Sequence, residues 1–323
     1  MTDLVVEAHG LRKTFRDGAR KVVAVDGLDL SVERGGVHGF LGPNGSGKTT
    51  TIRMLLGLSK PDRGEISVLG AQLPGALDAV SPRVGAVVES PRFSPDLTGR
   101  RNLQLLAGLA GLPAARADAA LERVALADRG KDRFGGYSLG MRQRLGVAAG
   151  LLKEPELLVL DEPTNGLDPA GILDMRELIR GLGESGITVL LSSHILAEVQ
   201  QVCSAVSIIG DGRLLAGGKV DDLLGEGVVR TRIAVADQDR AATLLTEGGY
   251  QVTRDDGALL VEGHEHPEEI VRLLALQELY ATDVRAVRPT LETFFLALTG
   301  HRPEPGDDPD ADEAAERLGS GAR

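Results

Sequence analysis

Short apolar runs recur along the first two thirds of the chain and predict buried strands. Each run is almost continuously apolar, and stretches with helical spacing separate one run from the next. Because strands that are buried on both faces read as continuous apolar runs, this alternation predicts an α/β domain with a largely parallel sheet. The runs are Val37–Leu41, Val84–Val88, Leu157–Leu160, Thr188–Leu191 and Val206–Ile209.

Apolar runs of this kind do not occur between Glu89 and Glu154. Leu, Ala and Arg recur there at helical spacing instead, as in NLQLLAGLAGL and ADAALERVAL. Such spacing places the apolar side chains on one face of a helix. We therefore expect a helical subdomain at about residues 89–154, inserted in a sheet domain that spans residues 1–220.

The pattern changes after Gly217 and Gly218. Residues 225–300 predict a strand, a helix, two strands, a helix and a strand, in that order, followed by a final helix. The order βαββαβ is typical of a small ferredoxin-like α+β domain. Residues 301–323 are rich in Pro, Gly and carboxylates and have little to bury, so we expect a disordered acidic tail.

Charge and composition narrow the function classes. The 323 residues carry a net charge of −11, which argues against a protein that binds nucleic acid, because such binding requires clustered Lys and Arg. The single cysteine, Cys203, cannot form an internal disulfide, and the N-terminal residues do not resemble a signal peptide. The longest apolar stretch, Leu103–Leu112, is about half of the roughly 20 residues that span a bilayer. We expect a cytoplasmic protein whose membrane role, if any, comes through a partner.

The stretch FLGPNGSGKTT follows the first apolar run and matches the phosphate-loop pattern G-x-x-x-x-G-K-[ST]. Its glycines let backbone N–H groups surround phosphates, its lysine supplies a cation, and its threonine hydroxyl can bind Mg²⁺. The pattern predicts a nucleoside triphosphate site and is compatible with a kinase, a GTPase or an ATPase; the absence of an Asn-Lys-x-Asp element disfavours a GTPase. The residues that we assign to the nucleotide are Gly42, Pro43, Asn44, Gly45, Ser46, Gly47, Lys48, Thr49 and Thr50.

The stretch LLVLDEPTNGLDP places Asp161 at the carboxyl end of an apolar strand, where doubly wound sheets bind ligands. Carboxylate and hydroxyl oxygens suit Mg²⁺, so we expect Asp161 and Thr49 to hold the metal. Successive side chains diverge in a strand, which leaves Glu162 to orient or deprotonate the attacking water. Asp168 and Pro169 then predict the N-cap and first residue of the next helix.

Another predicted strand ends in SSHILAE, which places His194 at the same edge of the sheet. A single histidine is often structural, but at a strand end that bears ligands we expect it to be catalytic. A loop with two glycines leads to a further helix in GGYSLGMRQR, where Ser138 is placed as the N-cap.

Together these motifs resemble one family, the ATP-binding subunits of ATP-binding cassette (ABC) transporters. The resemblance covers roughly Leu4 to Gly218 and includes the phosphate loop, LLVLDEP, NGLD, the histidine and YSLGMRQR, which stands where the family usually has a Leu-Ser-Gly-Gly-Gln signature. It implies a P-loop NTPase cassette with a RecA-like α/β fold and a helical insertion, followed here by the small C-terminal α+β domain. It also implies an ATPase that uses ATP and Mg²⁺.

The resemblance further implies a homodimer in which two ATP molecules lie between paired cassettes. Ser138 and Gly140 would then contact the γ-phosphate that is bound by the second copy, and Asp168 would lie beside the nucleotide. Phe15, in LRKTFRDG, resembles the aromatic residue that stacks on adenine; a core phenylalanine is the alternative. Glu89 stands where the family usually has Gln, and we expect it to reach Mg²⁺ through an oxygen.

Glu89, SPDLTGRRNL and the ending RPTLETFFLALTG are similar to the branch of bacterial drug-resistance exporters, of the bacitracin and daunorubicin type, whose permease is a separate polypeptide. This branch implies a subunit that is peripheral on the inner face of the cell membrane, with the coupling surface near Glu89–Asn102. A soluble ABC ATPase that acts on ribosomes or DNA is the alternative function.

A third hypothesis makes residues 225–300 a sensing module, with His264 and His266 as metal ligands. Two histidines on an exposed turn, with no cysteine beside them, are more often solvated. We therefore expect that this region assists homodimerisation instead.

Overall fold

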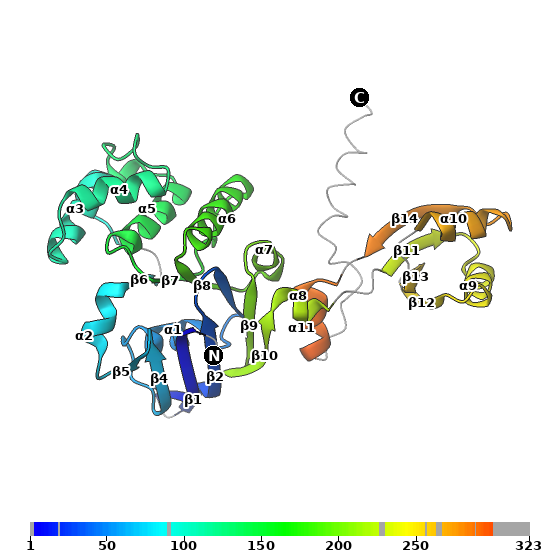
Figure 1. The fold of residues 1–323 in the computed structure, drawn as a ribbon, viewed down its shortest axis with the longest axis horizontal. Coiled ribbons are helices and arrows are strands. Elements are labelled where there is room, and N and C mark those ends of the chain that lie inside the picture. The colour runs from blue at the N-terminus through cyan, green and yellow to red at the C-terminus, as the bar shows by residue number, and fades with distance from the viewer. Residues whose placement is uncertain are drawn as a thin grey trace. The chain divides into compact units, whose positions relative to one another are not determined.

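The computed structural model describes residues 3–18, 20–88, 92–225, 230–255, 257–262, 267–287 and 289–299 (Figure 1). Its chain divides between Leu223 and Leu224 into two units. Glu89, the pair His264 and His266, and residues 301–323 lie outside the described residues, so the expectations for them stay predictions.

The first unit is built around a six-stranded sheet with the order β10-β9-β3-β8-β7-β6. Its strands pair in parallel except β10, which is antiparallel to β9 at the edge. All five apolar runs form strands of this sheet, so the predicted parallel sheet is confirmed. The strands are β3 (Val37–Leu41), β6 (Val84–Val87), β7 (Leu157–Asp161), β8 (Thr188–Ser193), β9 (Ala205–Gly210) and β10 (Arg213–Lys219).

A second sheet, with the order β2-β1-β4-β5, is antiparallel and was not predicted from the apolar runs. Register shifts interrupt the alternation of apolar and polar residues along its long strands. One such shift lies between Ala8 and Leu11 in the pairing of β1 with β2. Its strands are β1 (Leu4–Asp17), β2 (Arg20–Glu33), β4 (Arg63–Val68) and β5 (Ala71–Leu73).

The main hydrophobic core joins these two sheets through helix α1 (Lys48–Leu55). The helix contributes Ile52 and Met54, the antiparallel sheet contributes residues such as Leu28, and the parallel sheet contributes Phe40 and Val159. All five side chains are fully buried. Because α1 begins directly after the phosphate loop, this packing fixes the loop against the sheet.

Between β6 and β7, three α helices are described where the helical insertion is expected. Helices α5 and α6 each begin with a side-chain cap. At α5, Ser138 Oγ accepts from Met141 N (3.3 Å). At α6, Asp168 Oδ1 accepts from Gly171 N (3.0 Å), and Pro169 lies in the first turn. The helices of this unit after α1 are α2 (Leu77–Val80), the 3₁₀ turn η1 (Ser81–Arg83), α3 (Gly99–Leu109), α4 (Ala115–Arg123), the 3₁₀ turn η2 (Phe134–Gly136), α5 (Leu139–Leu151), α6 (Pro169–Glu184) and α7 (Leu196–Gln200).

The second unit contains an antiparallel sheet with the order β12-β13-β11-β14. Helices α9 and α10 enclose its core, which includes Ile233, Leu245 and Leu274. The element order and the sheet order are those of a ferredoxin-like unit, as predicted. The elements from the boundary onward are α8 (Val220–Leu224), β11 (Arg230–Val235), α9 (Gln238–Glu247), β12 (Gln251–Asp255), β13 (Ala258–Glu262), α10 (Pro267–Ala275), β14 (Ala281–Val287) and α11 (Leu291–Thr299).

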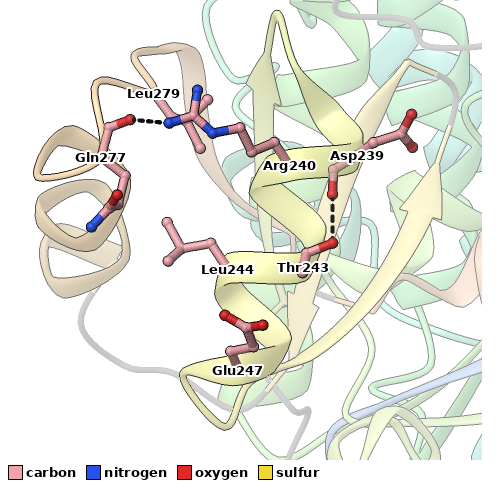
Figure 2. Close-up of a pocket in the computed structure, with 7 residues that line it drawn as sticks. All are labelled: Asp239, Arg240, Thr243, Leu244, Glu247, Gln277 and Leu279. Carbon is pink, nitrogen blue, oxygen red and sulfur yellow. Dashed lines mark hydrogen bonds between the residues drawn. The ribbon is translucent and has the colours of Figure 1, made fainter.

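A groove of about 360 Å³ lies in the second unit, between α9 and the turn that joins α10 to β14 (Figure 2). Arg240 and Glu247 line it from α9, with Leu244 between them, and Gln277 and Leu279 line it from the turn. The guanidinium of Arg240 donates to the carbonyl oxygen of Gln277 (3.1 Å). None of the helices in the described part of the chain has the length and apolar content that crossing a bilayer requires.

Candidate functional site

Three neighbouring parallel strands end at one edge of the central sheet and bring the predicted residues together. Strand β3 leads into the phosphate loop, β7 ends at Asp161, and β8 ends at Ser193 directly before His194. Because β8 pairs with both β3 and β7, the three carboxyl ends are adjacent. The sheet topology thus gathers residues that are up to about 150 positions apart in sequence, at the edge where such sheets bind ligands.

Glycines shape the phosphate loop where no other residue fits. Gly47 has φ +102°, in the left-handed region, and a Cβ there would lie 2.4 Å from the carbonyl oxygen of Ala24. A Cβ on Gly42 would lie 2.4 Å from the carbonyl oxygen of Ile209. Ser46 Oγ is buried with no hydrogen-bond partner among the described residues. Since buried polar atoms are normally bonded, this orphan hydroxyl indicates that the loop is made to receive a polar ligand.

Lys48, the first residue of α1, reaches back over the loop. Its side chain is only 6% exposed, and Nζ donates to the carbonyl oxygens of Gly42 (2.6 Å) and Pro43 (3.3 Å). Nζ also lies 3.3 Å from Glu162 Oε1. This ammonium is buried, so its surroundings screen its charge only weakly. It should therefore attract an anion in the loop strongly. Thr49 and Thr50 follow it in the first turn of α1.

Asp161 is 8% exposed and is held by two hydroxyl groups. Ser192 Oγ donates to Oδ1, and Thr49 Oγ1 donates to Oδ2 (3.0 Å). Ser192 stands opposite Asp161 in the parallel pairing of β7 with β8. Ser192 was missed from the sequence, although its place two residues before the catalytic candidate His194 at a strand end is a usable signal.

Glu162 lies just past β7 in an unusual backbone conformation. Its φ is +49°, the left-handed region that residues other than glycine rarely adopt. Its N–H donates to the carbonyl oxygen of Ser192 (3.2 Å) and to Ser192 Oγ (3.1 Å). One carboxylate oxygen faces Lys48, and the other lies 2.8 Å from His194 Nδ1. Backbone strain of this kind tends to occur at functional sites, and here the carboxylate of Glu162 has partners different from those of Asp161.

A second polar contact joins the segment after β7 to the segment after β8. This contact was also missed from the sequence. Thr164 Oγ1 donates to Glu198 Oε2 (2.8 Å), and both residues are buried. Arg176 of α6 lies beside this pair, with Nη2 3.8 Å from Glu198 Oε1. The contact connects the segment after β7 with α7, one turn after His194.

Ser138 is the N-cap of α5, and Gly140 lies in the first turn of this helix. A Cβ on Gly140 would lie 3.9 Å from Leu167 Cδ2, and a Cβ on Gly166 would lie 3.3 Å from Leu139 Cδ2. The start of α5 therefore packs near the loop that ends at Asp168. Ser138 and Asp168 are both exposed, and Leu139 is 45% exposed.

Phe15 does not belong to the core. It lies on β1 opposite Val22 of β2, and 45% of its surface is exposed. Lys13 Nζ stands 5.6 Å from the centre of the ring. The alternative of a core phenylalanine is thus wrong, because nearly half of the residue is exposed to solvent.

The geometry as a whole suits binding and hydrolysis of a phosphate anhydride. The glycine-rich loop, an ammonium and the start of a helix would hold phosphates, and two carboxylates with separate partners lie at its edge. Glu162, in contact with both Lys48 and His194, is positioned to accept a proton.

Comparisons with known proteins agree with this chemistry. Residues 25–165 match the family described as ABC transporter. The bacitracin transport ATP-binding protein BcrA of Bacillus licheniformis is 39% identical over 92% of this chain and 97% of its own length. The daunorubicin resistance ATP-binding protein DrrA3 of Streptomyces coeruleorubidus is 40% identical over 93% and 97%, respectively.

Solved structures show the same fold. A dimeric structure of a post-hydrolysis state of an ATP-binding cassette bound to ADP and Pi has a TM-score of 0.60 and 23% identity, covering 67% of this chain and 99% of that one. An ATP-binding subunit of an ABC transporter has a TM-score of 0.58 and 31% identity, covering 68% and 91%. The chain belongs to the ATP-binding proteins of ABC transporters. It is an ATPase of the P-loop cassette fold, whose ATP hydrolysis is coupled to transport.

Proposed function

We propose that this ATPase powers an exporter of antibiotics or other hydrophobic compounds through a separate permease, at the inner face of the cell membrane. The names of its relatives support this, since they include bacitracin transport, daunorubicin resistance and Nod factor export proteins. The similarity extends over nearly the whole chain, so the C-terminal unit is shared with them as well.

The observation that most directly supports the proposal is that four side chains lie together at one edge of the sheet: Lys48, Asp161, Glu162 and His194. Residues Gly42–Thr50 bind the phosphates of ATP, and Phe15 stacks on adenine. Lys48 exchanges its contacts with the loop carbonyls for phosphate oxygens, which releases one oxygen of Glu162. Glu162 then takes the proton from the attacking water, while His194 holds the other oxygen and supplies a hydrogen bond.

Mg²⁺ fits the oxygen atoms that the site presents. Asp161 Oδ2 and Thr49 Oγ1 are 3.0 Å apart, and carboxylate and hydroxyl oxygens are the ligands that this ion prefers. Bound there, Mg²⁺ would neutralise charge on the β- and γ-phosphates. Ser192 orients Asp161 for this role. Glu89 stays a candidate ligand outside the described residues.

We propose that two copies pair, so that Ser138 and Gly140 of one copy meet the ATP held by the other. The exposed Ser138 cap and the start of α5 present N–H groups and a positive helix end, which favour an anion. Asp168 ends the loop that packs against this start, which brings it beside the same nucleotide. The usual signature glycine and glutamine are Leu139 and Met141 here, and the groups that touch phosphate flank them.

Helix α3 offers a surface for the permease. Leu105, Leu106 and Leu109 are exposed, Leu109 by 86%, and the three lie within four positions on one helix. Exposed apolar patches of this kind mark protein contacts. Together with the nearby range 89–102, this patch is the surface where we place coupling to the membrane protein.

We propose that residues 225–300 form an accessory domain that assists pairing of the two copies. Arg240, Thr243, Leu244 and Glu247 share one stripe of α9, spaced three, four and seven positions apart (Figure 2). Two such helices that cross antiparallel about a two-fold axis between Thr243 and Leu244 would place each Arg240 opposite the Glu247 of the second copy. This self-complementary charge pattern is what favours a second copy as the partner.

Purification from solubilised membranes tests the exporter proposal. We expect a protein with several membrane-spanning helices to be recovered in fixed ratio with this chain. Leu109→Asp should lower that recovery, and Leu58→Asp, which changes another exposed leucine in the same unit, should not. Recovery with ribosomes in place of a membrane protein would overturn the proposal and favour the alternative function.

A further inference from the structure

Two side-chain contacts connect the segment after β7 with the segment after β8. The first joins Glu162 to His194, with 2.8 Å between Oε2 and Nδ1. The second joins Thr164 to Glu198, with 2.8 Å between Oγ1 and Oε2. Both contacts run between the same pair of segments, so the second contact limits how far the first can open or shift.

The two contacts differ in their surroundings. Glu162 and His194 are partly exposed, with 20% and 34% of their side chains accessible. Thr164 and Glu198 are 8% and 7% exposed. A buried hydroxyl and a buried carboxylate lose more free energy when they separate than exposed groups do, because no water replaces the lost partner. The exposed contact can therefore exchange partners during a reaction cycle while the buried one persists.

Arg176 makes the buried contact tolerable for a carboxylate. Its Nη2 lies 3.8 Å from Glu198 Oε1, and its Nη1 donates to Gln201 Oε1 (2.8 Å) at the end of α7. Arg176 belongs to α6, which packs on β8 and β3 of the sheet. The contacts of Glu198 and Gln201 with Arg176 thus hold α7 against α6, and His194 lies two residues before α7 begins.

We propose that Glu198 is a positioning residue for hydrolysis: by holding Thr164 it fixes the spacing between the two segments at which His194 meets Glu162. The inference rests on the proposed roles of Glu162 and His194. Glu198 touches neither the nucleotide nor the attacking water and acts only through His194. Losing the buried contact leaves the phosphate loop and Phe15 in place, so it should slow turnover without weakening ATP binding.

Thr164→Val tests this with little change in shape, because valine replaces the hydroxyl by a methyl group. Thr164→Ser is the matched control, since it keeps the hydroxyl and loses only the methyl. We expect kcat to fall about tenfold in Thr164→Val, with KM and the equilibrium affinity for ATP within about twofold of the wild type. Thr164→Ser should keep most of the turnover. If Thr164→Val does not fold, Thr164→Ala removes the same hydroxyl and is compared with Thr164→Ser in the same way.

Repeating the Thr164→Val comparison in the His194→Ala protein distinguishes a positioning role from a loss of stability. If Thr164 and Glu198 act through His194, Thr164→Val should lower kcat no further once His194 is absent. Equal losses in both backgrounds would overturn the inference, as would wild-type kcat in Thr164→Val. Should His194→Ala itself retain full turnover, the proposed role of His194 is wrong, and that result is distinct from a failure of the Thr164 comparison.

Discussion

His38 offers a test of the packing on which the phosphate loop depends. The residue lies on β3, four positions before Gly42, with its side chain buried and Nε2 2.9 Å from Ser207 Oγ of β9. Burial disfavours the charged ring and lowers the pKa of His38 from 6.5 to about 4. The folded protein therefore keeps this histidine neutral at pH values where the unfolded chain binds a proton.

The sign and size of the effect follow from this difference. As the pH falls below 6.5, the unfolded state takes up a proton on His38 and the folded state does not until about pH 4, so the folded state loses stability through that window. Between pH 7 and pH 5 this linkage lowers the free energy of unfolding by about 2 kcal/mol. At pH 7 and above the contribution is small.

The assay is urea unfolding of the wild type and of His38→Gln at pH 7 and pH 5, followed by circular dichroism. His38→Gln cannot titrate and can still bond Ser207, so the wild type should lose about 2 kcal/mol more than the variant on going to pH 5. Exposed groups such as His9, whose pKa is raised by its hydrogen bond to Glu7, act equally in both proteins and cancel. Equal pH dependence in the two proteins would refute a neutral, buried His38.

Three further predictions concern the site and the pairing of two copies. Phe15→Ala should weaken equilibrium ATP binding about tenfold while Phe15→Tyr keeps it, because stacking needs the ring; unchanged affinity in the alanine variant would exclude stacking. Ser138→Arg should abolish ATP-dependent dimers in sedimentation and lower ATP turnover about tenfold or more, whereas Ser138→Thr should keep both; a functional arginine variant would place the signature elsewhere. Arg240→Glu should weaken nucleotide-free self-association about tenfold, and adding Glu247→Arg should restore it; failure of the second change to restore it would contradict the paired α9 helices.

The sequence predicts those parts of the fold and site that depend on neighbouring residues. The phosphate loop lies between a buried strand and a helix, so its pattern and its setting can be read in one short stretch. The same holds for the caps Ser138 and Asp168, which bond to groups three residues ahead. The parallel sheet is predicted because its strands are buried on both faces and hence continuously apolar.

What the sequence does not reveal depends on contacts between distant segments. Register shifts in the pairing of β1 with β2 interrupt the alternation that would identify these strands. Ser192 faces Asp161 because β7 and β8 pair in a particular register, and Glu198 meets Thr164 across 34 positions. Serine, threonine and glutamate are common at surfaces, so their residue types alone do not mark these roles.

We propose that Glu162 drives ATP hydrolysis at the edge of the phosphate loop, and Glu162→Gln removes its ability to accept a proton. Phosphate release and equilibrium ATP binding are measured on the same preparation. We predict that turnover falls about 10²-fold or more while ATP affinity stays within about twofold, because the amide keeps the shape of the side chain and cannot accept the proton. Near-normal turnover in Glu162→Gln, with ATP still bound, would show that Glu162 is not the proton acceptor.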